Sequence, residues 1–217
     1  MKSIVILISG RGSNMEALLA AVACGELPVR VAAVISNRPN AAGLASATAR
    51  GIATAVVDHR NFADRETFDS ALAAAIDTHA PDLVVLAGFM RILTEGFVHH
   101  FAGRLINIHP SLLPSFPGLH THRQALAAGV RIHGCSAHFV TPALDHGPLI
   151  VQAAVPVLDD DDEARLAARV LAQEHRIYPL AVRWFAEGRL RLVGERVQFD
   201  GSQDASTFLQ APLERGA

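Results

Sequence analysis

The chain alternates short runs of apolar, often β-branched residues with longer segments in which alanine and leucine recur at helical spacing. The short runs predict strands at residues 3–8, 29–36, 53–57, 82–88 and 104–109. The longer segments predict helices at residues 14–24, 41–50 and 65–79. Strands that alternate with helices indicate a mostly parallel sheet, and the continuous apolar strands fit burial on both faces.

The pattern changes after Pro110, where a loop rich in proline, glycine and histidine begins. Beyond this loop the sequence predicts a short helix, two strands and a long helix, at residues 123–128, 131–141, 148–157 and 161–187. The spacing of the two strands suggests an antiparallel pair or a longer excursion between strands. The predicted fold class is therefore α/β: a Rossmann-like first half with helices on both faces of the sheet, followed by an antiparallel C-terminal part.

Length and composition limit the domain organisation and the partners. Half of the 217 residues are apolar, which is enough for one compact domain, predicted at residues 1–201 and followed by a polar tail at 202–217. The formal net charge of -2 gives no general attraction to nucleic acid or to an anionic membrane. We therefore expect small-molecule substrates and anion binding only at a local site.

The two cysteines and the N-terminal segment indicate where the protein works. Cys24 and Cys135 are far apart in the sequence and form no C-x-x-C pair, which fits a reducing cytosol. The apolar run that opens the chain stops at Ser9, too early for a signal peptide or a membrane span. A cytoplasmic protein is expected, and the sequence leaves a monomer and a homodimer equally open.

A glycine-rich turn, SGRGSN at residues 9–14, joins the first predicted strand to the first predicted helix. Its glycines permit close approach of a ligand, and the helix N-terminus favours an anion. Met15 stands where a dinucleotide fingerprint requires its third glycine, and no Gly-Lys-Ser/Thr follows, so neither NAD nor a P-loop is favoured. Two interpretations stay open: a phosphomonoester site formed by Gly12, Ser13 and Asn14 with added charge from Arg11, or a simple capped turn.

The segment INIHPSLLP at residues 106–114 places an amide and an imidazole at the end of a predicted strand. Residues two apart in a strand face the same side, so Asn107 and His109 point together into the crevice at the carboxyl edge of the sheet. An amide donates to a developing oxyanion, and an imidazole transfers protons near neutral pH. The pair suits acyl transfer to a nucleophile that the substrate provides, although the segment alone slightly favours a buried histidine before a loop proline.

Asp145 is the one carboxylate between the two downstream strands, which makes it a candidate partner for the imidazole or else a solvated loop residue. The acidic run at residues 159–162 is expected to be a solvated cap of the long helix rather than a metal site. The other candidate metal ligands show no zinc-binding spacing, so no metal is expected: His120, His122, His133, His138 and His146.

Several segments together resemble the phosphoribosylglycinamide formyltransferase family: ISGRGSN, DLVVLAGFMRIL, INIHPSLLPSFPGLHTHRQAL, HGCSAHFVTPALDHGPLIVQAAVPV and QEHRIYPLAVRWFAEGRL. The resemblance covers roughly residues 3–193. It implies transfer of the formyl group of 10-formyltetrahydrofolate, as co-substrate, to the primary amine of glycinamide ribonucleotide in purine biosynthesis. The transfer would be direct, without a metal or a covalent intermediate.

The same resemblance implies roles for individual residues. Asn107 would stabilise the oxyanion, His109 would transfer the proton, and Asp145 would orient His109 and favour its protonated form. The implied ribonucleotide-binding residues are Gly12, Ser13, Asn14, Met15 and Glu174. The implied folate-binding residues, with main-chain groups of 141–145, are Arg65, Met90, Arg91, Ile92, Leu93, Asn107, Thr141 and Asp145.

Three positions depart from the usual family pattern, and other folate-dependent families share the catalytic trio. Arg11, Cys135 and His146 replace the more usual asparagine, threonine and small residue, so Arg11 would strengthen phosphate binding and His146 would perturb the titration of the trio. Methionyl-tRNA formyltransferase would need an additional C-terminal domain and a basic surface, and formyltetrahydrofolate hydrolase an N-terminal regulatory domain. A non-catalytic phosphate-binding module is the alternative from another functional class.

Overall fold

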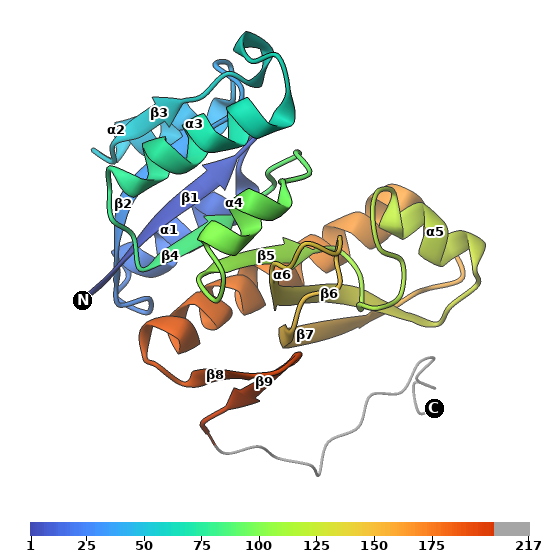
Figure 1. Cartoon of the computed structure of the whole chain (residues 1–217). Helices are drawn as coiled ribbons and strands as arrows, with labels where there is room; N and C mark the ends of the chain where they lie inside the picture. The colour runs from blue at the N-terminus through green and yellow to red at the C-terminus, as the bar shows by residue number, and fades with distance from the viewer. Residues whose placement is uncertain (202–217) are drawn as a thin grey trace.

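A seven-stranded sheet forms the centre of the computed structural model, which describes residues 1–201 (Figure 1). The strands follow the order β3-β2-β1-β4-β5-β6-β7. Their bounds are β1 (Lys2–Ile8), β2 (Val29–Ser36), β3 (Thr54–Val56), β4 (Leu83–Leu86), β5 (Leu105–His109), β6 (Ile132–Phe139) and β7 (Leu149–Pro156). A separate hairpin contains β8 (Leu190–Val193) and β9 (Arg196–Phe199). The tail predicted at 202–217 lies outside the described residues.

Helices cover both faces of the sheet. They are α1 (Ser13–Ala23), α2 (Ala42–Ala49), α3 (Arg65–Asp77), α4 (Glu95–His100), α5 (Thr121–Ala127) and α6 (Glu163–Ala186), with a 3₁₀ helix, η1 (His59–Asn61). Alternate residues of β1 enter two different cores: Ile4, Ile6 and Ile8 pack with α1 and α6, whereas Val5 and Leu7 pack with α3 and α4. This burial on both faces explains why β1 reads as a continuous apolar run.

The strand directions confirm the predicted fold class. The pairs β1–β2, β1–β4, β2–β3 and β4–β5 are parallel, while β6 pairs antiparallel with both β5 and β7. The sequence did not predict α4 or the β8–β9 hairpin. Helix α4 has six residues, too few to show a period, and Thr94 caps it by accepting a hydrogen bond from the Phe97 amide. The strands of the hairpin have four residues each and are largely exposed, so they lack a clear alternation.

The acidic run before α6 is only partly the solvated cap that the sequence predicted. Asp162 caps the helix by accepting a hydrogen bond from the Arg165 amide at 2.8 Å. The Asp161 side chain is instead 1% exposed and receives two hydrogen bonds from Arg169, at 2.7 and 2.8 Å. These hydrogen bonds lower the pKa of Asp161 and offset the opposing effect of burial. Asp161 therefore fastens the segment before the helix to the second turn of the helix.

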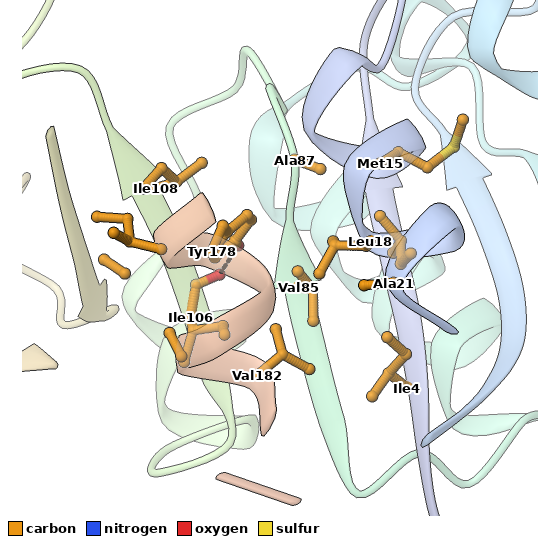
Figure 2. Packing of buried hydrophobic residues seen from close by; sticks show 14 of the residues in the cluster. Ile4, Met15, Leu18, Ala21, Val85, Ala87, Ile106, Ile108, Tyr178 and Val182 are labelled. Carbon is orange, nitrogen blue, oxygen red and sulfur yellow. Dashed lines mark hydrogen bonds between the residues drawn. The ribbon is translucent and has the colours of Figure 1, made fainter. Parts of the chain in front are cut away.

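Tyr178 of α6 anchors the helix to the middle of the sheet (Figure 2). Its side chain is fully buried, and its hydroxyl lies 2.8 Å from the carbonyl oxygen of Leu86 and 3.1 Å from that of Ile106. These two carbonyls belong to β4 and β5, whose pairing ends at Leu86 and Asn107. One phenolic proton is thus shared between two strands that separate just beyond this point.

Replacement of Tyr178 by phenylalanine tests this anchor. We expect Tyr178→Phe to lower the free energy of unfolding by about 1–3 kcal/mol, because it leaves buried carbonyl groups without a donor and creates almost no cavity. Urea denaturation at neutral pH would measure the change. Ser70→Ala is the control, because the Ser70 hydroxyl also donates to a main-chain carbonyl but does so on an exposed surface where water replaces it. Equal effects of the two substitutions would contradict the assigned role.

Candidate active site

Three loops begin at one edge of the sheet. Strands β1, β4 and β5 are neighbours and run parallel, so the segments that follow them emerge at their common carboxyl edge. A cavity of about 730 Å³ lies at this edge. Its lining includes Asn107, His109 and Asp145, together with residues 88–93 and 140–144. The predicted catalytic trio and the predicted donor-binding segment therefore share one cavity.

His109 is held between two acceptors. Its side chain is 7% exposed, and Nε2 lies 3.1 Å from the carbonyl oxygen of Phe116, which requires a proton on Nε2. On the other side of the ring, Nδ1 lies 3.5 Å from Oδ2 of Asp145, an ion-pair distance longer than an N–H···O hydrogen bond. Nδ1 therefore faces a carboxylate at ion-pair distance, while Nε2 donates to the main chain.

Asp145 links two loops. Its backbone has a φ of 54°, a left-handed conformation that aspartate tolerates better than most residues. Oδ2 accepts a hydrogen bond of 2.8 Å from the Gly118 amide, and the side chain is 8% exposed. Gly147 permits the loop to return to β7, because a Cβ at this position would overlap the carbonyl oxygen of Phe139. The loop conformation thus brings the carboxylate against His109 instead of exposing it to solvent.

His138 orients the amide of Asn107, a contact that the sequence reasoning missed. Antiparallel pairing of β5 with β6 places the two residues opposite each other, and Asn107 Nδ2 donates to His138 Nε2 at 3.3 Å. His138 Nδ1 donates to the carbonyl oxygen of Phe139 at 2.9 Å. Burial lowers the pKa of His138 and keeps the ring neutral, as an acceptor must be. The second proton on Nδ2 of Asn107 remains free to face a substrate.

The glycine-rich turn offers unpaired main-chain amides. Gly12 precedes α1 in a left-handed conformation with a φ of 73°, and its carbonyl accepts from the Glu16 amide. Within residues 1–201, the amides of Ser13, Asn14 and Met15 donate to no protein acceptor. The Met15 side chain is fully buried, so only its main chain can contact a ligand. The N-terminus of α1 is thus suited to bind an anion.

Asn14 and Glu174 form a buried pair across the sequence. Asn14 Nδ2 donates to Glu174 Oε2 at 2.7 Å, and the residues are 8% and 7% exposed. Burial raises the pKa of Glu174, although the hydrogen bond from Asn14 opposes this effect. The Oδ1 atom of Asn14 is buried without a partner among the described residues, which leaves an acceptor for a ligand. Asn14 and Glu174, two of the five residues predicted to bind the ribonucleotide, are therefore in direct contact.

The predicted donor-binding residues divide between two cavities. Thr141 and the segment from Met90 to Leu93 line the cavity that contains the catalytic trio, and the Arg91 guanidinium lies over the Phe68 ring. Arg65 lines a neighbouring cavity of about 810 Å³, which shares Ile92 and Leu93 with the first. The turn residues Gly12 to Met15 and Glu174 do not line either cavity. The main-chain amides at the start of α1, the trio and Arg65 therefore lie in three separate regions.

The three residues that depart from the family pattern lie in different surroundings. Arg11 is exposed beside the glycine-rich turn. Cys135 is fully buried in β6, where burial raises the pKa of its thiol to about 12 and makes it unreactive. His146 is exposed, and its Nδ1 lies 2.9 Å from the Leu144 carbonyl oxygen. Its predicted influence on the trio stays a prediction.

Metal-binding clusters and membrane-spanning helices are both absent from the described residues. In residues 1–201, histidine, cysteine, aspartate and glutamate side chains form no group of three or more that could hold a metal ion. In the same part of the chain, every helix is too short or too polar to span a membrane.

Comparisons with known proteins place the chain among enzymes. A family model described as formyl transferase matches residues 2–182. Phosphoribosylglycinamide formyltransferase of Escherichia coli (strain K12) is 53% identical over 201 residues, which cover 93% of this chain and 95% of that protein. The trifunctional purine biosynthetic protein adenosine-3 of Homo sapiens is 44% identical over 189 residues, which cover 87% of this chain but 19% of the human protein.

A solved structure of the same enzyme family is also similar to this chain. Glycinamide ribonucleotide transformylase 1 from Symbiobacterium toebii superimposes with a TM-score of 0.90 and 49% sequence identity, covering 92% of this chain and 94% of that chain. The matched family region includes every strand of the seven-stranded sheet and every residue of the trio. The chain belongs to the formyl transferase family and, within it, to the phosphoribosylglycinamide formyltransferases.

Proposed function

We propose that the protein transfers the formyl group of 10-formyltetrahydrofolate to the amine of 5'-phosphoribosylglycinamide, in the cytoplasmic de novo synthesis of IMP. The observation that carries the proposal is the arrangement of Asn107, His109 and Asp145 around one cavity, beside the main chain of residues 90–93. The names of the relatives support the choice of ribonucleotide as acceptor.

The geometry suits direct transfer. The substrate amine attacks the formyl carbon, and the carbonyl oxygen gains negative charge that the free proton of Asn107 Nδ2 stabilises. The new C–N bond forms as the bond between the formyl carbon and N10 of the folate breaks. One proton leaves the amine and one reaches N10, so a single imidazole at Nδ1 of His109 can serve both steps. Asp145 stabilises the positive charge on the ring while it carries the proton.

The two substrates would approach from different sides. The phosphate of the ribonucleotide would bind the free amides of Ser13, Asn14 and Met15, with Gly12 allowing close approach. The buried pair of Asn14 and Glu174 would contact the ribonucleotide beyond its phosphate. The folate would occupy the cavity along residues 90–93 and the main chain of 141–145. Arg65, at the neighbouring cavity, would reach only an outer part of the donor.

A direct assay tests the proposed reaction. Purified protein is mixed with 10-formyltetrahydrofolate, with and without glycinamide ribonucleotide, and the release of tetrahydrofolate is followed together with formation of the formylated amine. We expect turnover that requires the amine and yields both products in equal amounts. Release of formate without the amine would identify a hydrolase instead, and binding without turnover would identify a non-catalytic module.

Asp145→Asn isolates the role of the carboxylate. We expect kcat to fall by at least about 10²-fold while the dissociation constant of the ribonucleotide changes by less than about threefold, because Asp145 acts on the imidazole and not on the bound ground state. Asp77→Asn is a matched control, since Asp77 also contacts a histidine, His100, at 2.7 Å but on the exposed surface. A kcat close to that of the control variant would remove Asp145 from the mechanism.

Packed aromatic rings support the loop that holds His109. Phe116, whose carbonyl accepts from His109, packs edge-on against the His133 ring with 5.8 Å between centroids. His133 in turn packs against His122 at 5.4 Å. His133 is 1% exposed, and burial lowers its pKa from 6.5 to about 4. The neutral form of this histidine is therefore part of the folded structure around the trio.

This buried histidine predicts acid sensitivity. Below pH 6.5 the unfolded chain protonates His133, whereas the folded protein does so only near pH 4. The stability that the neutral ring contributes is complete above pH 6.5 and is lost as the pH falls through this window. Between about pH 7 and about pH 5, we expect the free energy of unfolding to decrease by about 1–2 kcal/mol more in the wild type than in His133→Phe. Urea denaturation at both pH values measures the free energy of unfolding of each protein. Equal losses of this free energy in the two proteins would contradict the prediction.

A further inference from the structure

Ser9 begins the glycine-rich turn, yet its hydroxyl is directed at a different loop. Its oxygen accepts a hydrogen bond from the Met90 amide at 2.7 Å, and its proton is donated to Oδ1 of Asn37 at 2.6 Å. The Ser9 amide also donates to the carbonyl oxygen of Gly88 at 3.1 Å. Ser9 is 4% exposed, so no water competes for these contacts. The hydroxyl is fully used within the protein and is not available to a phosphate.

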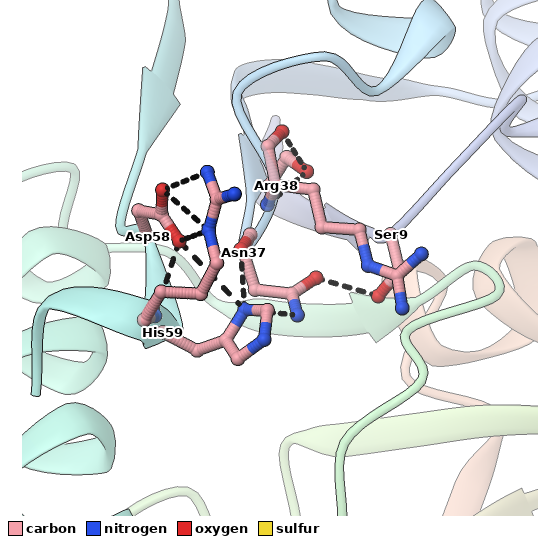
Figure 3. Close-up of polar contacts among 7 residues, drawn as sticks. Ser9, Asn37, Arg38, Asp58 and His59 are labelled. Atoms are coloured by element: carbon pink, nitrogen blue, oxygen red, sulfur yellow. Dashed lines mark hydrogen bonds and ion pairs between the residues drawn. The ribbon is translucent and has the colours of Figure 1, made fainter.

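Asn37 is fixed behind Ser9 by a second set of contacts (Figure 3). It follows β2 directly, is fully buried, and its carbonyl accepts from His59 Nδ1 at 2.8 Å. Because this ring nitrogen donates, the nearby Nδ2 of Asn37 cannot donate to it, and Oδ1 remains directed at Ser9. Asp58 caps the 3₁₀ helix that bears His59 by accepting from the Arg60 amide. The acceptor for the Ser9 proton is thus held rigidly.

The segment that Ser9 holds is otherwise anchored through side chains, since Arg91 lies over the Phe68 ring and Leu93 packs against the core. The Met90 and Ile92 side chains are 65% and 59% exposed, so their burial does not position the chain. Phe89 is buried in the core, and the far end is held where the Thr94 amide donates to the Asp69 carboxylate at 2.6 Å. Between these points, the hydrogen bond from Met90 to Ser9 is the main-chain contact that sets the path of the segment along the cavity.

We propose that Ser9 is a positioning residue for the formyl donor: its hydroxyl, braced by Asn37, fixes the Met90 amide and with it the main chain on which the folate lies. This inference rests on the proposed function, since it assigns the cavity beside residues 90–93 to the folate. Ser9, the first residue of the glycine-rich turn, would then help to bind the folate and would not bind the phosphate of the ribonucleotide. The adjoining sites for the two substrates are therefore joined through one side chain.

Ser9→Ala removes the acceptor for the Met90 amide and the donor to Asn37 and adds no bulk. We expect the KM for 10-formyltetrahydrofolate to rise about five- to twentyfold, while the KM for the ribonucleotide changes by less than about twofold. Titration with tetrahydrofolate by calorimetry would show a matching loss of affinity. Ser9→Cys, which keeps the size of the side chain with weaker hydrogen bonding, is expected to show a smaller change in the same direction.

Ser36→Ala is the matched control. Ser36 is a fully buried serine at the end of β2 that also accepts and donates one hydrogen bond each, but with the main chain of Arg38. We expect it to lower the thermal unfolding midpoint about as much as Ser9→Ala and to leave both KM values within about twofold of wild type. A purely structural role for Ser9 would give both variants the same kinetic profile.

The outcomes separate this inference from the proposed function. If the wild type transfers formyl groups but the Ser9 variants keep the donor KM, or raise the ribonucleotide KM equally, the inference is overturned. If the wild type transfers none, the proposed function fails, and the tetrahydrofolate titration still decides whether Ser9 controls binding in the cavity. A donor-specific loss in Ser9→Ala and Ser9→Cys, absent in Ser36→Ala, supports the assignment.

Discussion

The site depends on the point where β4 and β5 stop pairing. Adjacent parallel strands satisfy each other's main-chain groups, so a cavity between their ends leaves buried carbonyls that require another donor. The Tyr178 hydroxyl serves this purpose at Leu86 and Ile106. Beyond this contact the segments that follow the two strands separate. The segment after β4 leads to residues 88–93, and β5 continues to Asn107 and His109. Helix α6 therefore supplies the donor that allows the sheet to open.

The same helix also reaches the glycine-rich turn. Glu174 and Tyr178 are four residues apart on α6 and so lie on one face of the helix. Tyr178 fixes the helix to β4 and β5, while Glu174 accepts from Asn14 at the start of α1. A carboxyl group buried this deeply is costly unless it is hydrogen-bonded, and burial raises its pKa. One helix thus links the start of α1 to β4 and β5.

Local pattern was sufficient for the fold but not for the contacts that complete the site. The strand at 29–36 and the trio's shared edge were predictable, because apolar runs set the strands and parallel pairing sets the edge. The contact between His138 and Asn107 depends on the register between β5 and β6, which spacing alone does not define. The contact between Ser9 and Met90 joins residues 81 positions apart, and the role of Ser9 is concealed by its place in a phosphate-type motif.

The position of the His109 ring depends on the order of two loops. Phe116 accepts from one ring nitrogen, while Asp145, which faces the other, is itself held by the Gly118 amide. Phe116 and Gly118 belong to the same loop, so displacement of that loop removes the acceptor at Nε2 and the support of the carboxylate at Nδ1 together. Each ring nitrogen then loses the oxygen that faces it. A ligand that fills the cavity and holds this loop in place consequently also fixes the orientation of the His109 ring.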